Sequence, residues 1–339
     1  MIKRILYTLL IMFPVVASAQ INTDRVMAIG RNALYFEDYV LSIQYFNQVI
    51  NAKPYLSDPY FYRGLAKINL DDFQGAESDC SEAIERNPFV VSAYQVRGLA
   101  RIQQNNFAGA IEDYTKALEF DPENIGVWHN MALCRIRQED YKGAKNDLDK
   151  LIAISPRYTK AYLMRGEVDL KQKDTLAAEK DFGKAIEIDR YDADTWASRA
   201  ILRLQQQRYK DAEADFDHAI RLSTRNSGVY INRALARYHQ NNLRGAMSDY
   251  DIALDIDPNN FIGHYNRGLL RAQVGDDNRA IQDFNFVIEM EPDNMMAIFN
   301  RGLLLDQTGD YKGAIKDYST VINEYPNFFA GLSVQSAGT

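Results

Sequence analysis

The sequence predicts an all-α fold, an α-solenoid of nine 34-residue helix-turn-helix repeats. Alanine recurs at one constant interval along the chain, proline keeps the same interval, and apolar residues recur at helical spacing within each interval. Self-similarity at such a period is typical of repeat architectures, in which each unit packs on its neighbours. The alanines are Ala76, Ala110, Ala144, Ala178, Ala212, Ala246, Ala280 and Ala314, and the prolines are Pro54, Pro88, Pro122, Pro156, Pro258, Pro292 and Pro326.

Nine intervals continue this spacing without insertion or deletion. A residue's place in its repeat is given below as a position, counted from the first residue of that repeat. The predicted repeats are 23–56, 57–90, 91–124, 125–158, 159–192, 193–226, 227–260, 261–294 and 295–328.

The third repeat illustrates the first helix and the turn that follows it. Tyr94, Gly98 and Ile102 recur at helical spacing, and Asn105 and Asn106 then interrupt the pattern. Apolar residues three to four apart indicate one face of a helix, and paired asparagines indicate a turn. The first half of each repeat therefore predicts a helix that ends in a tight turn.

The second helix of this repeat is predicted over residues 108–120. Ala110 and Ala117 lie on one face, and Asp121 precedes Pro122. The residue before a proline avoids the helical region, so the helix ends there. The small side chains on this face, with the glycine at position 8 of the first helix, allow the two helices to approach closely.

The N-terminal segment 1–19 predicts a secretory signal peptide. Residues 1–4 are positively charged at Lys3 and Arg4, residues 5–16 are mostly apolar, and residues 17–19 read Ala-Ser-Ala. This order is typical of a signal peptide with cleavage after Ala19. The alternative is an uncleaved membrane anchor, although twelve apolar residues are few for a spanning helix, which needs about 20.

The charge balance disfavours a nucleic-acid partner. The chain carries 39 basic and 46 acidic residues, and removal of Lys3 and Arg4 with the signal leaves 37 and 46, a net charge of −9. Nucleic-acid binding requires a basic face. Cys80 and Cys134 fall two repeats apart, so we expect free, buried and inert thiols.

The repeats resemble the tetratricopeptide repeat. They share an aromatic at position 4, a small residue at position 8, alanine at position 20 and proline at position 32, with departures at Ser42, Arg190 and Thr224. The resemblance implies a right-handed superhelix of antiparallel helix pairs whose first helices line a concave groove. The aromatics at position 4 are Tyr60, Tyr94, Trp128, Tyr162, Trp196 and Tyr230, and the small side chains at position 8 belong to Gly64, Gly98, Ala132, Gly166, Ala200, Ala234, Gly268 and Gly302.

Seven repeats carry arginine at position 7, where the family usually has leucine, together with aspartate at position 23. The simplest interpretation is a structural ion pair encoded in each repeat, with partners in the same repeat or in a neighbour. A row of anion-binding sites is the alternative, and the matched aspartates disfavour it. The pairs are Arg63 and Asp79, Arg97 and Asp113, Arg165 and Asp181, Arg199 and Asp215, Arg233 and Asp249, Arg267 and Asp283, and Arg301 and Asp317.

Two further patterns accompany these pairs. The fourth repeat has Met131 at position 7 but keeps Asp147, for which Arg135 at position 11 is the expected partner. Glutamine recurs at position 14, as a hydrogen-bonded row or, in the favoured interpretation, as a solvated edge. These glutamines are Gln104, Gln138, Gln172, Gln206 and Gln240.

The family geometry places positions 2, 5, 9, 12 and 13 on the concave side, where aliphatic and aromatic residues have a polar margin. Such a surface suits a partner's extended peptide or amphipathic helix, and the alternative is that part of the stripe is core between repeats. Asn232, Asn266 and Asn300 lack the basic neighbours of the family's carboxylate clamp. The candidate binding residues are Phe61, Leu99, His129, Arg137, Lys171, Leu235, His239, Tyr265, Leu269, Phe299 and Leu303.

No catalytic signature accompanies the repeats. Phosphate-binding loops, nucleophile elbows and metal-binding motifs are missing from the sequence, and the four histidines fall at four different positions. We therefore expect a protein that is not an enzyme and that uses no catalytic residues, cofactor or metal.

After Pro326, segment 329–339 begins like a tenth repeat and then turns to small polar residues, which predicts a truncated repeat. Because solenoids need a polar capping helix, an exposed end predicts either truncation of a longer protein or end-to-end self-association.

The favoured function is an exported scaffold of the periplasm or cell envelope that binds protein or peptide partners in its groove. The alternatives are the repeat array of a larger protein with a C-terminal catalytic or cell-wall-binding domain, and a module that binds glycan or peptidoglycan.

Overall fold

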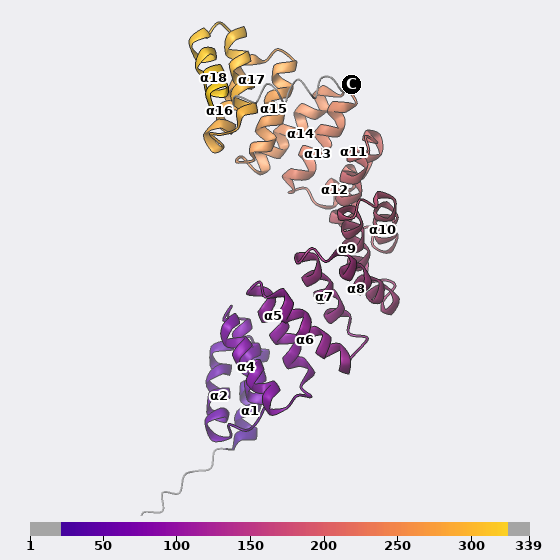
Figure 1. The fold of residues 1–339 in the computed structure, drawn as a ribbon, viewed down its shortest axis with the longest axis vertical. Coiled ribbons are helices and arrows are strands. Elements are labelled where there is room, and N and C mark those ends of the chain that lie inside the picture. Colours follow the sequence, from indigo (N-terminus) through magenta and orange to yellow (C-terminus); the bar gives the residue numbers. More distant parts are fainter. Residues whose placement is uncertain (1–21, 325–339) are drawn as a thin grey trace, which may run out of the picture. The chain divides into compact units, whose positions relative to one another are not determined.

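The computed structural model describes residues 22–324. Those residues form eighteen α-helices and no strand, which confirms the predicted all-α solenoid (Figure 1). The predicted signal peptide 1–19 and the segment 329–339 lie outside the described residues, as do residues 325–328 of the ninth repeat. Helices consecutive in the chain pack as pairs, in two compact units that divide after Pro156.

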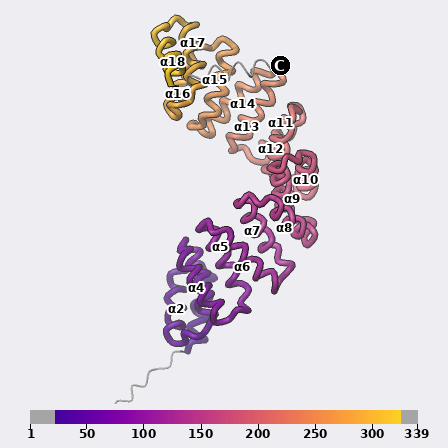
Figure 2. The backbone as a smooth tube through the Cα atoms, in the orientation of Figure 1, coloured from indigo at the N-terminus to yellow at the C-terminus, as the bar shows by residue number. Residues whose placement is uncertain are grey.

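The first unit holds the first four helix pairs, shown from indigo to magenta in Figure 2. Each predicted repeat in it contributes one first helix and one second helix. They are α1 (Thr23–Tyr35), α2 (Tyr39–Ala52), α3 (Asp58–Ile68), α4 (Phe73–Arg86), α5 (Val91–Gln103), α6 (Phe107–Phe120), α7 (Ile125–Arg137) and α8 (Tyr141–Ile154).

The second unit holds the remaining five pairs in the same alternation of first and second helices. They are α9 (Thr159–Lys171), α10 (Thr175–Ile188), α11 (Ala193–Gln205), α12 (Tyr209–Leu222), α13 (Ser227–His239), α14 (Leu243–Ile256), α15 (Phe261–Gln273), α16 (Asp277–Met290), α17 (Met295–Gln307) and α18 (Tyr311–Glu324).

The turn inside each repeat has one fixed backbone shape. The residue at position 15 adopts a positive φ, the left-handed conformation that reverses the chain after a helix. Glycine, which adopts it without strain, occupies this position only in the last two repeats. The nine residues are Glu37, Asp71, Asn105, Glu139, Lys173, Gln207, Asn241, Gly275 and Gly309.

An acidic or amide side chain then starts most second helices. In α4, α6, α8, α10 and α14, the side chain at position 16 accepts a hydrogen bond from a backbone N–H in the first turn. Such a cap satisfies one of the donors that a helix leaves open at its N-terminus. Turn and cap together fix where each second helix begins.

The core lies between the two helices of a repeat and between neighbouring repeats. The alanines at positions 20 and 27 are buried, as are Cys80 and Cys134. A Cβ at Gly166 would lie 2.6 Å from the Phe182 ring, so position 8 excludes larger side chains there. Burial raises the pKa of the Cys80 thiol to about 12 and that of Cys134 to about 11, as expected for inert thiols.

Candidate functional site

The first helices present an aliphatic row to solvent at position 9. Leu99, Ile201, Leu269 and Leu303 are exposed, although leucine and isoleucine are usually buried in helical proteins. We call the surface formed by positions 1, 2, 5, 9 and 13 of the first helices the first-helix face.

A cavity of about 250 Å³ opens on this face in the last two repeats. Phe261, Ile262 and Tyr265 of α15 line it together with Asn294 and Met296. The two helices that supply its apolar walls, α15 and α17, contact each other directly. Three of these apolar side chains are themselves exposed, so the cavity is open to an incoming apolar group.

Tyr265 and Phe299 have both core and surface roles. The Tyr265 ring lies edge-on to Phe284 at 5.8 Å, and the Phe299 ring lies 6.1 Å from that of Tyr318. The Asn300 side-chain amide donates to the Tyr265 hydroxyl at 3.2 Å. Burial raises the pKa of Tyr265, so its hydroxyl is neutral and fixed in direction at the cavity wall. Position 5 is thus partly core, as the alternative interpretation held.

The other predicted binding residues are divided between the two compact units. Leu99 and Arg137 are exposed in the first unit, where Phe61 and His129 are half-buried, with Phe61 packed against the core around Tyr60. In the second unit Lys171 is exposed, Leu235 is half-buried, and the exposed His239 ring stacks on Tyr209 at 4.6 Å.

The structure brings four members of the predicted set together. Tyr265 and Leu269 lie one turn apart on α15. Phe299 and Leu303 lie one turn apart on the neighbouring α17. The cavity residues Phe261, Ile262 and Met296 were absent from the predicted set. Position 2 was already expected on this face, so the exposed apolar residues there were the signal that could have found them.

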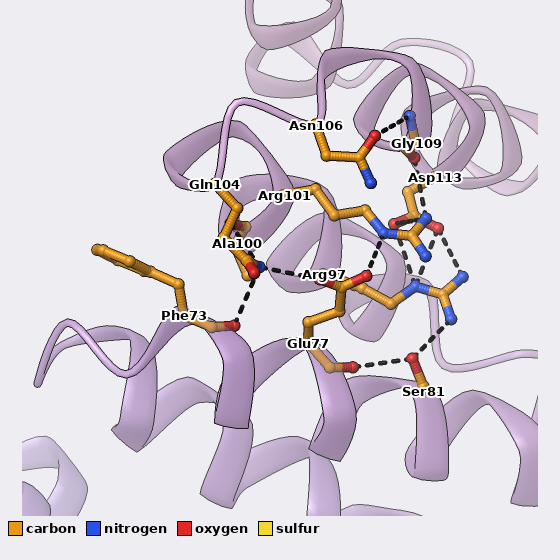
Figure 3. Close-up of polar contacts among 10 residues, drawn as sticks. All are labelled: Phe73, Glu77, Ser81, Arg97, Ala100, Arg101, Gln104, Asn106, Gly109 and Asp113. Carbon is orange, nitrogen blue, oxygen red and sulfur yellow. Dashed lines mark hydrogen bonds and ion pairs between the residues drawn. The ribbon is translucent and has the colours of Figure 1, made fainter.

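The position 7 arginines lie away from this cavity, against second helices. Arg97 donates from Nη2 to Asp113 Oδ1 at 2.6 Å within its own repeat (Figure 3). Arg97 Nη1 also donates to Ser81 Oγ of the preceding repeat at 3.1 Å. One guanidinium therefore joins the second helices of two consecutive repeats.

The within-repeat pair recurs at six further repeats with the same atoms involved. The pairs are Arg63 with Asp79, Arg165 with Asp181, Arg199 with Asp215, Arg233 with Asp249, Arg267 with Asp283 and Arg301 with Asp317. All of these aspartates are at most 5% exposed. Each carboxylate is therefore desolvated and held by a charged donor.

The contact to the preceding repeat uses an acceptor at position 25 whose residue type varies. Arg199 faces Gly183 there and has no side-chain acceptor at this position. The contacts are Arg63 with Asn47, Arg97 with Ser81, Arg233 with Asp217, Arg267 with Asp251 and Arg301 with Asn285. Position 25 is the partner that sequence reasoning missed.

A basic residue at position 11 adds a second link between repeats. Arg101 donates from Nη1 to Asp113 at 3.0 Å and from Nε to Glu77 of the preceding repeat at 2.8 Å. Arg203 with Glu179, and Arg237 with Glu213, repeat the second contact. Because all these charges have partners, the ladder in the described part of the chain offers no free cationic site for an anion.

Two of the five glutamines differ from the solvated edge that the sequence favoured, while Gln138 and Gln172 are exposed as expected. Gln104 donates to Glu77 at 2.9 Å, and Gln240 donates to Glu213 at 2.7 Å. Both acceptors are glutamates at position 21 of the preceding repeat, whereas at Gln206 the corresponding Glu179 accepts from Arg203 and Arg208 instead. That acceptor is set by the neighbouring repeat, which the spacing of the glutamines alone did not reveal.

The fourth repeat has only one arginine for its buried carboxylate. Arg135 Nε donates to Asp147 Oδ2 at 2.7 Å and shares its charge with Asp140 at 2.8 Å. Met131 occupies position 7 within the apolar cluster around Tyr114. Burial, only partly offset by Arg135, raises the pKa of Asp147 to about 6.

Residues 22–324 hold neither a metal-binding cluster nor a membrane-spanning helix. No group of three His, Cys, Asp or Glu side chains is placed to hold a metal ion in that part of the chain. None of the helices there is both long and apolar enough to span a bilayer.

The sequence matches family models over much of its length. Models described as tetratricopeptide repeat match residues 125–158, 159–192, 198–261 and 265–327, and one described as TPR repeat matches residues 98–134. No curated protein matches the chain in sequence.

Solved structures with the same fold include a tetratricopeptide repeat protein from Parabacteroides merdae, with a TM-score of 0.56 and 21% identity over 74% of this chain and 98% of that chain. Pseudomonas aeruginosa pilF gives a TM-score of 0.54 and 19% identity over 64% and 97%. The Cut9–Hcn1 hetero-tetramer of the APC/C gives a TM-score of 0.55 and 13% identity, over 86% of this chain and 57% of that chain. At these identities the likeness shows the fold alone.

Proposed function

The chain belongs to the tetratricopeptide repeat family, and from this premise we propose that it is a non-catalytic scaffold that binds a partner's peptide or helix on the first-helix face. A scaffold of this kind needs accessible apolar surface on rigid elements, with polar groups that fix the register of the ligand. The exposed aliphatic row at position 9 meets the first requirement.

The observation that carries the proposal is the open apolar cavity on α15 and α17. Its volume of about 250 Å³ is comparable to one large side chain with space around it, and Ile262 and Met296 are exposed at its walls. Binding energy concentrates where an apolar anchor enters such a pocket. Leu269 and Leu303 continue the apolar surface one turn further along the same helices.

The two helices that line the cavity also carry amide side chains along their length. Asn266 and Asn300 lie on the same two first helices, and Gln273 and Gln307 stand at position 13. Asn300 reaches the cavity wall through its hydrogen bond to Tyr265, and amides along an apolar face support a ligand that combines one apolar anchor with an unpaired backbone, such as an extended peptide. The absence of charge in this amide set makes a strongly ionic ligand a poor fit.

We place the protein in the periplasm or cell envelope, on the strength of the segment 1–19. This location is tested by expressing the full chain in a bacterial host and sequencing the N-terminus of the mature product. Cleavage after Ala19 with recovery in the periplasmic fraction is expected. An intact Met1 in the cytoplasm would contradict the placement.

The binding proposal is tested by selecting peptides from a random phage-displayed library on the mature chain. Dissociation constants of the selected peptides are then measured for the wild type and for Met296→Asp. A buried charge in the cavity should raise the dissociation constant at least tenfold, which corresponds to about 1.4 kcal/mol.

Met290→Asp is the matched control, because Met290 is exposed near the end of α16 and outside the cavity. It should leave peptide affinity unchanged. Equal affinities for Met296→Asp and the wild type would overturn the proposal. Retention on peptidoglycan sacculi without peptide binding would instead favour a glycan-binding module.

A further inference from the structure

The last described helix, α18, presents an apolar face to solvent. Tyr311 is 64% exposed, Ile315 is 65% exposed and Ile322 is 54% exposed. These residues occupy positions 17, 21 and 28 of the ninth repeat. A contiguous patch of large apolar side chains indicates a contact surface, whereas single exposed apolar residues are common on any protein.

The same positions are covered in earlier repeats by the following first helix. Ile111, at position 21 of the third repeat, packs against the cluster that contains Met131 of α7. Ile281, at position 21 of the eighth repeat, packs against the cluster that contains Ala297 and Leu304 of α17. The face of α18 is therefore shaped to receive a further first helix.

Each junction between repeats also brings position 7 of the following first helix to position 25 of the preceding second helix. Arg301 Nη1 donates to Asn285 at 2.8 Å, and Thr115 Oγ1 lies 4.0 Å from Met131 Sδ. Position 25 of α18 is Ser319, which is exposed. A side chain at position 7 of a tenth first helix would meet this hydroxyl.

We propose that residues 329–339 of the same chain dock on this face as the first helix of a tenth repeat. The register continues through Pro326 at position 32, so that position 1 falls at residue 329. Leu332 then stands at position 4, where the other repeats place a large side chain. Gln335 stands at position 7 and can donate to Ser319, as the arginines do to their position 25 acceptors.

Small residues support this register. Gly331, Ser336 and Gly338 fall at positions 3, 8 and 10. In the third repeat the same positions hold Ala93, Gly98 and Ala100, all buried against neighbouring helices. A helix with small residues at these places can approach α18 as closely as the other first helices approach their partners.

A second copy of the chain is a weaker occupant, because α1 is polar on the corresponding side. Arg25 and Asn32 are exposed at positions 3 and 10 of the first repeat. Pressing these side chains onto Ile315 and Ile322 would bury polar groups without partners. The segment 329–339 has no charged residue and avoids this cost.

The test is site-directed cross-linking of the full mature chain with a short bismaleimide. The variant Ser319→Cys with Gln335→Cys should form an intramolecular link in most molecules, seen by mass spectrometry of the monomer band. Cys80 and Cys134 are fully buried and should not react. Asn285→Cys with Arg301→Cys links the same two positions inside the array at accessible residues and is the positive control.

Ser319→Cys with Ser333→Cys is the matched negative control, because position 5 points to another side of the helix. Its link yield should be at least fivefold lower. Cross-linked dimers as the main product would show a second copy on α18, and equal yields for Gln335 and Ser333 would show no defined docking. Either result overturns the proposal. Truncation provides a readout without added cysteines, since α18 amides should exchange more slowly in the wild type than in a chain that lacks 329–339.

Discussion

Arg267 is the best single residue for testing the ion-pair ladder. Its guanidinium donates to Asp283 at 2.7 Å and to Asp251 at 2.9 Å, and Asp283 is 2% exposed. Arg267→Ala leaves this buried carboxylate with Arg271 at 2.7 Å and His264 at 2.9 Å as its remaining partners, so we expect a loss of about 1.5–3 kcal/mol in the free energy of unfolding, as for a hydrogen bond to a charged group. Urea unfolding followed by circular dichroism measures the loss, and hydrogen exchange should locate it in α15 and α16.

Arg279→Ala is the control for this prediction. Arg279 is largely exposed and pairs only with Asp276, three residues away, at 3.4 Å. Exposed pairs of this type contribute less than about 0.5 kcal/mol. If Arg267→Ala costs no more than Arg279→Ala, the ladder does not stabilise the array.

Asp147 makes the free energy of unfolding depend on pH, because its carboxyl group is buried with only one cation beside it. Its pKa is about 6 in the folded chain, because burial outweighs Arg135, against about 3.9 in an unfolded chain. The folded state therefore binds the proton more tightly. The resulting stability is fully present below pH 3.9 and is lost as pH rises through 6. We expect this group to add on the order of 1–2 kcal/mol to the free energy of unfolding between pH 7 and pH 5.

Met131→Arg should remove this dependence, since it restores the position 7 cation beside Asp147 and can use Thr115 as its position 25 acceptor. The expected result is a smaller stability gain from pH 7 to pH 5 in the variant than in the wild type, measured by urea unfolding at both pH values. A gain of equal size in Met131→Arg and the wild type would exclude Asp147 as its source. Asp147→Asn, which cannot titrate there, should behave like Met131→Arg.

The sequence predicted residue pairs where both partners have fixed positions. Positions 7 and 23 carry the same residue types in seven repeats, so their pairing could be inferred from spacing alone. The acceptor at position 25 could not, because the residue type there changes from Asn47 to Ser81 to Asp217, and Gly183 has no side-chain acceptor at all. Only the packing of one repeat on the next places these residues beside the arginines.

At the scale of the element, the turn at position 15 stores strain in seven repeats. Gln207 has a φ of +62°, is exposed, and lies between α11 and α12. A side chain in this conformation costs about 1–2 kcal/mol. Glycine removes this cost, but its greater conformational freedom in the unfolded chain offsets part of the gain. Gln207→Gly should therefore raise the free energy of unfolding by about 0.5–1 kcal/mol, measured by thermal or urea unfolding.

Gly309→Ala is the reverse experiment. Its φ is +89°, and a Cβ there would meet no atom within 4 Å, so only the backbone conformation opposes the change. We expect a loss of about 1 kcal/mol. Unchanged stability in both variants would mean that the turn relaxes freely, contrary to the strain argument.

Helices were predictable as elements because the apolar period marks each helix, the turn residues follow each first helix and a proline follows most second helices. The binding face was predictable only in part. Tyr265 and Phe299 lie between surface and core, and the sequence pattern does not distinguish the two roles at position 5. Ile262 and Met296 stand at position 2, which was expected on this face, but only the packing of α15 beside α17 shows that they line one cavity.

At the scale of the whole molecule, two independent features of the sequence fix how each repeat packs on the one before it. One is the constant length of the repeat, which keeps each first helix in register with the second helix before it. The other is the set of junction partners at positions 7, 11, 21 and 25. Stability in such an array is the sum of repeat terms and nearest-neighbour terms, so both features act locally.

A deletion of one whole repeat tests this locality. Removing 227–260 joins the sixth repeat directly to the eighth, where Asp217 and Glu213 would meet Arg267 and Arg271 as new partners at the established positions. The shortened chain should keep the mean residue ellipticity of the wild type and unfold cooperatively at a slightly lower midpoint. Removing 227–256 instead leaves four extra residues, 257–260, before α15, so α15 loses its register against α12 and the amides of these two helices should exchange rapidly. If both deletions unfold alike, the constant repeat length is not what holds neighbouring repeats together.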